Sequence, residues 1–465
     1  MAEGQAKFLT GSLFRHVTVM SLTASVGLMA VFLVDFVDMI FIAMLGKAEL
    51  AAAIGYAGAI LFFTTSFGIG LAIAAGALVA RALGAGEDQL ARERTTHALS
   101  YGLIFGIVFS ILVWVFLAEL VALLGAVGET ANLAVMFLTI ILPSVPFLML
   151  GMMGSAILRA HGDARRAMMA TILGGLVNAV LDPILIFGLD LELAGAAIAS
   201  FIARIVIAIA ALYPLVRIYG GIAMPHLPGM RRDLMPVLSI AVPAILAQIA
   251  TPVGQAFVTR AMAGYGEAAV AGMAIVGRMV PVAFGVIFAL SGAVGPILGQ
   301  NFGAGNTARV REGFIAALWF TLVVILVVSG LLFVLRGPIA ALFEAEGVTR
   351  DLIYLFCGPL ALAFFFPGVL FVANAAFNNL GHPFYSTFTN WGRNLVALVP
   401  FVWLGSTLYG APGVLIGQAA AGVVFGIIAW VMALRVIAEG GKAPDPHQAL
   451  FGREGRLMTL FQQRR

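Results

Sequence analysis

The decapeptide GAGEDQLARE at Gly84–Glu93 reappears in outline as GAGNTARVRE at Gly303–Glu312. Both copies begin with Gly-Ala-Gly, end with Arg-Glu and follow a long apolar run. The copies start 219 residues apart, at positions 84 and 303 of a 465-residue chain, which predicts one unit of about six helices written twice. Doubled helical membrane proteins are typically transporters, because two similar halves around a central cleft can rock between inward-open and outward-open states.

The composition places the chain in a membrane. It is 62% hydrophobic and 10% charged, with a mean hydropathy of +1.06, which excludes a surface that faces water on all sides. The apolar runs are long and do not alternate, so they predict spanning helices and exclude a barrel. At roughly 20 apolar residues per span, the chain supplies about twelve. We expect the spans near residues 17–43, 51–80, 97–118, 133–158, 168–188, 194–215, 236–261, 268–298, 314–335, 352–378, 385–408 and 411–434.

The N-terminal region and the cysteine content narrow the class further. Lys7 and Arg15 precede an apolar stretch with no cleavage pattern of small residues, so we expect a retained first span and no secretory signal. The single cysteine, Cys357, excludes an intramolecular disulfide and a cysteine-rich metal cluster. We expect it to be an inert core residue.

Basic residues are distributed asymmetrically between the loops, and the pI is about 9.4. With both termini in the cytoplasm, the inner segments and the tail hold Lys7, Arg15, Arg81, Arg92, Arg94, Arg159, Arg165, Arg166, Arg217, Arg231, Arg232, Arg309, Arg311, Arg435, Lys442, Arg453, Arg456, Arg464 and Arg465. The outer loops hold only Lys47, Arg260, Arg336 and Arg350. This asymmetry predicts a multi-pass protein of the prokaryotic cytoplasmic (inner) membrane with both termini inside, and no nucleic-acid partner.

The repeat predicts two lobes of six helices each. We expect an N-terminal lobe at 1–216, a cytoplasmic linker at 217–233, a C-terminal lobe at 234–436 and a cytoplasmic tail at 437–465. Six is an even number, so the lobes share one orientation and form a parallel repeat. The two glycine-rich copies fall at inner helix ends, where glycine allows a sharp turn, and a hinge or gating role fits them better than contact with substrate.

Two pairs of polar residues interrupt the spans of the first lobe. Asp35 and Asp38 are three residues apart in helix 1, and Asn178 and Asp182 are four apart in helix 5, so each pair shares a helical face. Pro183 follows directly and deprives a nearby carbonyl of its helical donor. If helices 1 and 5 face each other, these groups form a buried pocket that suits a proton or a hard cation such as Na⁺. The alternative is that the helix 1 acids lie near the outer end and meet water.

The second lobe lacks this chemistry. Asp38 corresponds to Ala256, and Asn178 and Asp182 correspond to Ala397 and Phe401. Ion coupling is therefore expected in the N-terminal lobe alone. Other polar groups within spans are Arg204, Arg278, Arg393, Gln248, Asn374, Asn378 and Asn379. The arginines either attract anionic substrates or serve structure by snorkelling. We expect Gln248, Asn374, Asn378 and Arg278 to line the central substrate cleft.

Several segments resemble the multidrug and toxic-compound extrusion (MATE) family. They are VDMIFIAMLG at Val37–Gly46, the GAG copies, ILRAHGDAR at Ile157–Arg165, NAVLDPILIFG at Asn178–Gly188 and LAGAAIAS at Leu193–Ser200. The resemblance extends over nearly the whole chain in the family's order. It implies twelve helices in two parallel pseudo-symmetric lobes and efflux of bulky, often cationic molecules by H⁺ or Na⁺ antiport.

By this resemblance, the coupling residues are Asp38, Asn178, Asp182 and Ser200, with Asp35 as an extra acid one turn away. A possible Na⁺ site consists of Asp38, Asn178 and Asp182. Gln248 and Pro367 stand where some members carry acids in the second lobe, which favours the DinF-like branch. The chain departs from some members of that branch because Ser21–Phe36 contains no proline, so the resemblance does not extend to a proton-triggered kink of helix 1.

Together these features predict a monomeric secondary transporter, not an enzyme, with no cofactor beyond its coupling ion. It would exchange drug-like small molecules for H⁺, which we favour over Na⁺. A flippase for lipid-linked precursors is the main alternative, and a channel or receptor fits less well because neither needs an acid pocket in one lobe. A membrane enzyme has no support from the scattered histidines, which are His16, His97, His161, His226, His382 and His447.

Overall fold

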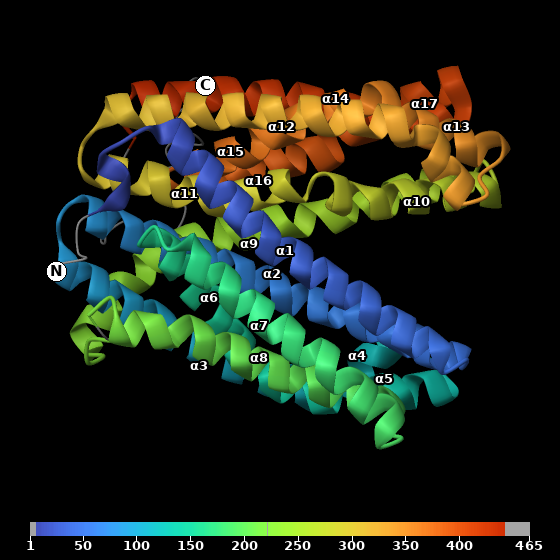
Figure 1. Ribbon diagram of the computed structural model, residues 1–465, viewed down its shortest axis with the longest axis horizontal. Helices are drawn as coiled ribbons and strands as arrows, with labels where there is room; N and C mark the ends of the chain where they lie inside the picture. The colour runs from blue at the N-terminus through green and yellow to red at the C-terminus, as the bar shows by residue number, and fades with distance from the viewer. Residues whose placement is uncertain (1–5, 221, 442–465) are drawn as a thin grey trace, which may run out of the picture.

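The computed structural model describes residues 6–220 and 222–441, and these residues are helical almost throughout (Figure 1). The first half contains η1 Lys7–Leu9, α1 Leu13–Met44, α2 Ala48–Gly84, α3 Asp88–Val115, α4 Leu117–Leu123, α5 Gly128–Ile141, η2 Leu142–Ser144, α6 Val145–Ala160, α7 Ala164–Pro183, η3 Ile184–Gly188 and α8 Glu192–Arg217. The second half contains α9 Leu227–Ala263, α10 Glu267–Ala283, α11 Gly285–Gly303, α12 Thr307–Leu342, α13 Gly347–Leu355, η4 Phe356–Leu360, α14 Ala361–Ala363, α15 Phe365–Asn379, α16 Phe384–Trp391, η5 Gly392–Ala397 and α17 Leu398–Ala438.

The predicted twelve-span architecture is confirmed. In the described part of the chain, ten helices are long and apolar enough to cross a membrane, and the bent pair Gly347–Ala363 and Phe365–Asn379 adds another. The segment Phe384–Ala438 counts once by length but reverses at Gly410, whose φ of 64° lies in the left-handed region that glycine adopts readily. Gly405 and Gly413 touch backbone to backbone on either side of this reversal, so the segment provides two crossings.

Apolar side chains cover much of the outer surface. Val334 is 73% exposed, Trp403 67% and Leu33 63%, all on long helices. Exposed apolar surface on this scale indicates contact with lipid. The chain is a multi-pass membrane protein.

Two hydrophobic cores correspond largely to the two halves. The first contains buried residues from Ile42 to Ala241, including the start of α9, and the second contains residues from Val258 to Ile437 together with a few from the first half. α1 joins the two, because Leu13 and Val17 at its start pack in the second core whereas Ile42 packs in the first. In Figure 1 this helix runs diagonally across both halves.

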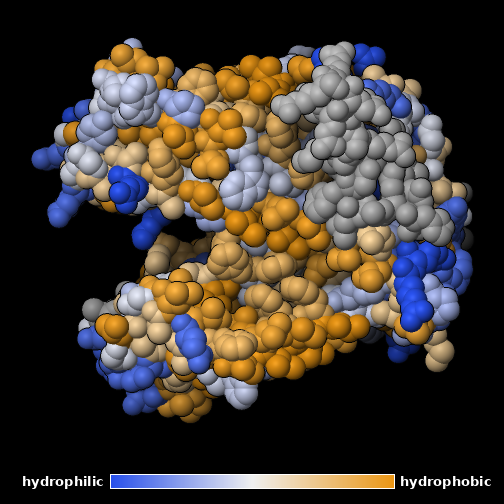
Figure 2. All heavy atoms as spheres, turned by 180° about the vertical axis from the view of Figure 1, so that it is seen from behind, coloured by the Kyte–Doolittle hydropathy of each residue, from blue (hydrophilic) through white to orange (hydrophobic). Residues whose placement is uncertain are grey.

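The halves meet at one end and diverge at the other. The end that carries the described start of the chain and the ends of α2 and α11 is here called the closed end (Figure 1). Figure 2 shows a deep hollow between the halves at the opposite side, here called the cleft.

The expected domain boundaries fall close to helix ends. Within the expected linker at 217–233, Arg217 ends α8, and residues from Leu227 onward already belong to α9. α17 extends to Ala438, so the expected tail begins inside this helix, and its residues 442–465 lie outside the described part of the chain.

Candidate ion-coupling site and closed end

α1 and α7 bring Asp38, Asn178 and Asp182 into one cluster. The Asn178 side-chain nitrogen Nδ2 donates to Asp38 Oδ1 at 3.0 Å and to Asp182 Oδ2 at 2.6 Å. Asp182 and Asn178 are buried, at 0% and 3% exposure, and Asp38 is partly buried. One amide therefore bridges two carboxylates carried by membrane-spanning helices.

The local sequence explains why this part of α7 approaches its neighbours. Gly174 lies against α8, because a Cβ there would be 2.1 Å from a side-chain carbon of Ile207. After Asp182, Pro183 supplies no N–H, and the chain continues into the π-helical turn η3. Irregular turns of this kind are frequent where a helix carries a functional group.

The cluster has an unused acceptor. Asp182 Oδ1 is buried and has no hydrogen-bond partner among the described residues. Two carboxylates that share one NH₂ repel each other when both are ionised, and a buried acceptor without a donor is costly. A bound proton or a single monovalent cation would relieve both penalties. Asn178 Oδ1 and the carboxylate oxygens are ligands suited to a hard cation, although no group of three or more His, Cys, Asp or Glu among the described residues is arranged as a metal site.

The other residues predicted for coupling lie outside this hydrogen-bond network. Ser200 on α8 is partly buried, and no hydrogen bond connects it to the cluster. Asp35 is exposed and has no hydrogen-bond partner in the described chain. The partly buried Arg204 donates to Ser144 Oγ at 2.9 Å, so the protein itself satisfies part of this guanidinium.

The residues assigned to the substrate cleft come from α9, α10 and α15. Gln248 is partly buried on α9, and Arg278 is exposed on α10. On α15, Asn378 Oδ1 accepts from Ser386 Oγ at 3.2 Å, so Asn378 is committed to packing against α16. Asn374 is partly buried.

The two Gly-Ala-Gly copies meet each other at the closed end. A Cβ on Gly84 would lie 1.9 Å from Gln300 O, and one on Gly303 would lie 2.1 Å from Arg81 O. α2 and α11 therefore cross with their backbones in contact, which only glycine permits. This crossing is here called the seam.

Two side chains complete the seam, each binding the end of a helix in the other half. Arg81 Nε donates to Asn379 O at 2.8 Å, at the last residue of α15. Gln300 Nε2 donates to Ala160 O at 2.7 Å, at the last residue of α6. The loop position that we expected for Arg81 is wrong, because it is 5% exposed and lies between the halves. The signal in the sequence was the repeat offset, which makes Arg81 and Gln300 equivalent.

The short helix η1, which precedes α1, packs against the closed end. Phe8 is 1% exposed, and its N–H donates to Gln300 Oε1 at 2.9 Å. Lys7 Nζ donates to Gly162 O at 3.1 Å, and Arg309 Nη2 donates to Phe8 O at 3.1 Å. This segment is therefore bonded to both halves.

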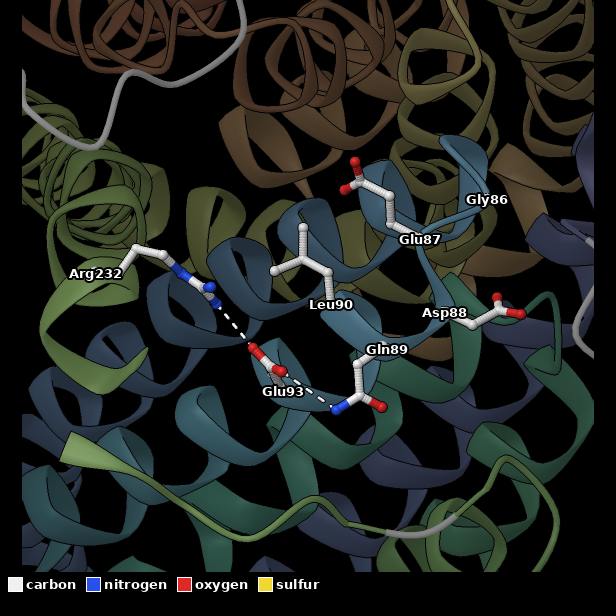
Figure 3. Close-up of a pocket in the computed structure, with 7 residues that line it drawn as sticks. All are labelled: Gly86, Glu87, Asp88, Gln89, Leu90, Glu93 and Arg232. Carbon is white, nitrogen blue, oxygen red and sulfur yellow. Dashed lines mark hydrogen bonds and ion pairs between the residues drawn. The ribbon is translucent and has the colours of Figure 1, made fainter. Parts of the chain in front are cut away.

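A buried hydrogen bond between side chains joins α3 to the start of α9. His97 Nδ1 lies 2.7 Å from Asp233 Oδ2, and both side chains are at most 2% exposed. Arg232 bridges Asp233 to Glu93 on α3, at 3.0 and 3.1 Å. Figure 3 shows Arg232 and Glu93 at the edge of an open surface pocket of about 650 Å³. Arg232 and Glu93 are paired with each other, so they serve contact between α9 and α3.

Comparison with known proteins identifies relatives over most of the chain. The MatE family model matches residues 24–184 and 243–404, which is more than half of the sequence. The FAD transporter of Shewanella oneidensis is 28% identical over 427 residues, covering 90% of this chain and 93% of that protein. The multidrug export protein MepA of Staphylococcus saprophyticus is 28% identical over 324 residues, covering 69% and 71%.

Solved structures share the same fold. A crystal structure of MATE in the bent conformation superimposes with a TM-score of 0.86 at 24% identity, over 95% of this chain and 98% of that one. An outward-facing multidrug resistance transporter of the MATE family gives 0.86 at 23% identity, over 94% and 99%. At these identities the structures establish the fold alone.

Proposed function

Since the chain belongs to the MatE family, we propose that it exports organic molecules by antiport, with the Asp38–Asn178–Asp182 cluster as the ion-coupling site. The observation that supports this proposal most strongly is the single amide of Asn178, which bridges two carboxylates while Asp182 Oδ1 has no donor. Such a cluster binds one positive charge in either of two forms, H⁺ or Na⁺. We favour H⁺, because a proton needs only the carboxylates whereas Na⁺ needs a fuller shell of oxygen ligands.

The cluster would act through α1. This helix carries Asp38 and contacts both cores, so a change in its attachment to α7 alters how the halves meet. When the cluster is ionised, the two carboxylates repel each other across Asn178. Loading with a proton removes this repulsion and favours a closer approach of α1 to α7, and this cycle would alternate the exposure of the cleft.

The lobe that carries the cluster favours the DinF-like branch, since the equivalent positions Ala256, Ala397 and Phe401 hold no ionisable group. We further propose that the protein works as a monomer. The closed end would face the cytoplasm, as the positive-inside distribution of basic loop residues indicates.

Drug-like organic molecules are the first candidate substrates, as in the multidrug export proteins that match the chain. A second candidate is FAD, because the FAD transporter matches over 90% of the chain. A lipid-linked precursor is the remaining alternative. All three would use the same cleft, and a transport assay with each compound distinguishes them.

The test is export in proteoliposomes under an imposed pH gradient and, separately, a Na⁺ gradient. We expect the pH gradient to drive transport in the wild type, and Asp182→Asn and Asp38→Asn each to abolish this drive. Asp351→Asn, the same change on an exposed residue of α13, serves as control. Full gradient-driven transport by both cluster variants at normal expression would falsify the proposed coupling site.

A further inference from the structure

Arg159 is the second-last residue of α6, and its side chain contacts α11 of the other half. A Cβ placed on Gly292 of α11 would lie 3.5 Å from Arg159 Nε. Arg159 is partly exposed, and in the described part of the chain it has neither a hydrogen-bond nor an ion-pair partner. In this respect it differs from Arg81 and Arg204, whose guanidiniums donate to protein oxygens.

The accessible faces of the two helices show which space Arg159 borders. Along α6, Leu148 and Met152 are partly exposed and lie on the same helical face as Arg159, whereas the residues between Met152 and Arg159 are buried. Along α11, a helix buried over most of its length, Ser291 is exposed and Gly292 partly exposed. α6 and α11 contact each other across the boundary between the halves. Their accessible faces beside Arg159 are here called the floor.

Aromatic rings border the same floor. Phe288, one turn before Ser291 and Gly292, is partly exposed, and its ring centroid lies 5.3 Å from that of Phe371 on α15. The floor site is defined here as Arg159, Ser291, Gly292, Phe288 and Phe371. It offers a cation, a hydroxyl and two apolar ring faces.

An unpaired guanidinium between packed helices is costly, and ionisable groups within membrane-spanning helices usually have a compensating partner. Among the residues that the structure describes, no carboxylate lies within 4.0 Å of Arg159 to act as one. Guanidinium binds carboxylate and phosphate oxygens through paired N–H donors, whereas it repels cations. We propose that the floor site binds the anionic oxygen group of an aromatic organic molecule, with the ring against Phe288 and Phe371.

This inference names a substrate class and so rests on the proposed export function, but binding tests it without transport. Fluorescein and rhodamine 123 suit the experiment, because their fused rings are alike while fluorescein is anionic and rhodamine 123 cationic at mildly alkaline pH. Affinity of each dye would be measured by fluorescence anisotropy on purified protein in phosphatidylcholine nanodiscs. Variants are Arg159→Gln, Arg159→Lys and, as control, Arg15→Gln on the exposed start of α1.

We expect Arg159→Gln to weaken fluorescein binding by about tenfold or more, as loss of a charged hydrogen-bond donor predicts, and to leave rhodamine 123 binding unchanged or tighter. Arg159→Lys should retain much of the fluorescein affinity, and Arg15→Gln all of it. Equal losses for both dyes, or no loss for fluorescein, would overturn the site. Retained rhodamine 123 binding also shows that the variant is folded. If the protein bound fluorescein selectively but transported nothing, the result would contradict the proposed export function and leave the binding site intact.

Two further measurements use the wild-type protein. Fluorescein should protect Arg159 from modification by phenylglyoxal, read by peptide mass spectrometry, and absence of protection contradicts the proposal even if the variants do not fold. Replacing part of the phosphatidylcholine with phosphatidylglycerol separates the sources of the anion. Competition by this lipid would show that the site binds an anionic lipid headgroup and would overturn the assignment to an aromatic molecule, whereas unchanged fluorescein affinity supports a free organic anion.

Discussion

Arg81 and Gln300 occupy equivalent positions in the two repeats, and each donates a hydrogen bond to the last carbonyl of a helix in the opposite half. Arg81 reaches Asn379 O at 2.8 Å, and Gln300 reaches Ala160 O at 2.7 Å. Helix ends leave carbonyls unpaired and carry a partial negative charge, so donors at these points are favourable. The exchange is symmetric and lies between the halves, which makes it a contact that must break if the closed end opens.

The glycines of the seam should be intolerant of a methyl group. Gly84→Ala would place a Cβ 1.9 Å from Gln300 O, and α2 and α11 must separate to relieve the overlap. We expect a loss of about 1–3 kcal/mol in the free energy of unfolding. Gly277→Ala on α10, where no atom lies within 4 Å of the new Cβ, is the matched control and should be neutral or slightly stabilising. Thermal unfolding in detergent measures both, and equal behaviour of the two variants would contradict the seam.

Separation of the halves can also be observed directly. Spin labels at Arg92 and Arg311, which are equivalent and exposed near the closed end, report the distance between α3 and α12 in a Cys357→Ala background. In Gly84→Ala we expect a longer mean distance than in the wild type. An unchanged distribution, together with unchanged stability, would show that the crossing adapts without opening.

Two replacements of Arg81 should distinguish the contribution of its hydrogen bonds to stability from the contribution of its charge. Arg81→Leu leaves Asn378 O and Asn379 O without these donors at a buried position, at a cost of about 1–3 kcal/mol. Arg81→Gln, which copies the residue at position 300, should recover part of this loss. The same unfolding and spin-label measurements apply. If Arg81→Leu matched the wild type in both stability and spin-label distance, these hydrogen bonds would not hold the two halves together at the closed end.

A pH-dependent contribution should come from His161, which lies between α6 and α7. Its ring stacks on Tyr219 at 4.3 Å between centroids, and burial lowers its pKa from 6.5 to about 4. The unfolded chain therefore binds more protons than the folded protein between these pH values, and stability falls as the pH drops from 6.5 toward 4. His161→Phe retains an aromatic ring and removes the titration.

At low pH we expect the free energies of unfolding of wild type and His161→Phe to differ by about 1–3 kcal/mol. The ring is partly exposed, so solvent screening keeps this difference below the value for a fully buried group. The difference should be absent above pH 6.5 and largest near pH 4.

The neighbouring acid, Asp163, does not confuse this comparison. Asp163 accepts a hydrogen bond from Tyr219 at 2.7 Å. Burial raises its pKa, but this hydrogen bond and those from Arg166 outweigh burial and hold it below the usual value. Since Asp163 titrates in both proteins, the difference between the two unfolding curves isolates the imidazole. Parallel curves would show that His161 titrates normally.

The fold was predictable from the sequence because spans and repeat follow from hydrophobicity and spacing. The same spacing placed Asp38, Asn178 and Asp182 on helical faces that can meet, and the structure joins them through one amide. The inward positions of Arg81 and Arg159 did not follow from the distribution of basic residues. Both stand at inner helix ends, where counting basic residues treats every arginine as a loop charge, and only the packing of α2, α6 and α11 shows which ones turn inward.

Histidine and serine positions show a similar limit. His97 pairs with Asp233 across 136 positions of sequence, which no local pattern reveals. Ser200 was assigned by resemblance to a motif, yet no hydrogen bond joins it to the cluster, since a motif fixes the position along a helix but not the contact. Contacts of this kind depend on how neighbouring helices rotate against each other.

Asn178 should be needed for coupling because its amide donates to both carboxylates. Asn178→Leu removes both donors and leaves Asp38 and Asp182 with fewer partners in a buried site. Hydrogen bonds to charged groups contribute about 1.5–3 kcal/mol each, so we expect export driven by the pH gradient to fall by about tenfold or more. Asn390→Leu makes the same change at a buried position of α16, outside the cluster, and serves as control for folding and expression. Efflux from proteoliposomes measures both variants, and comparable rates would mean that Asn178 supports the structure without assisting the coupling ion.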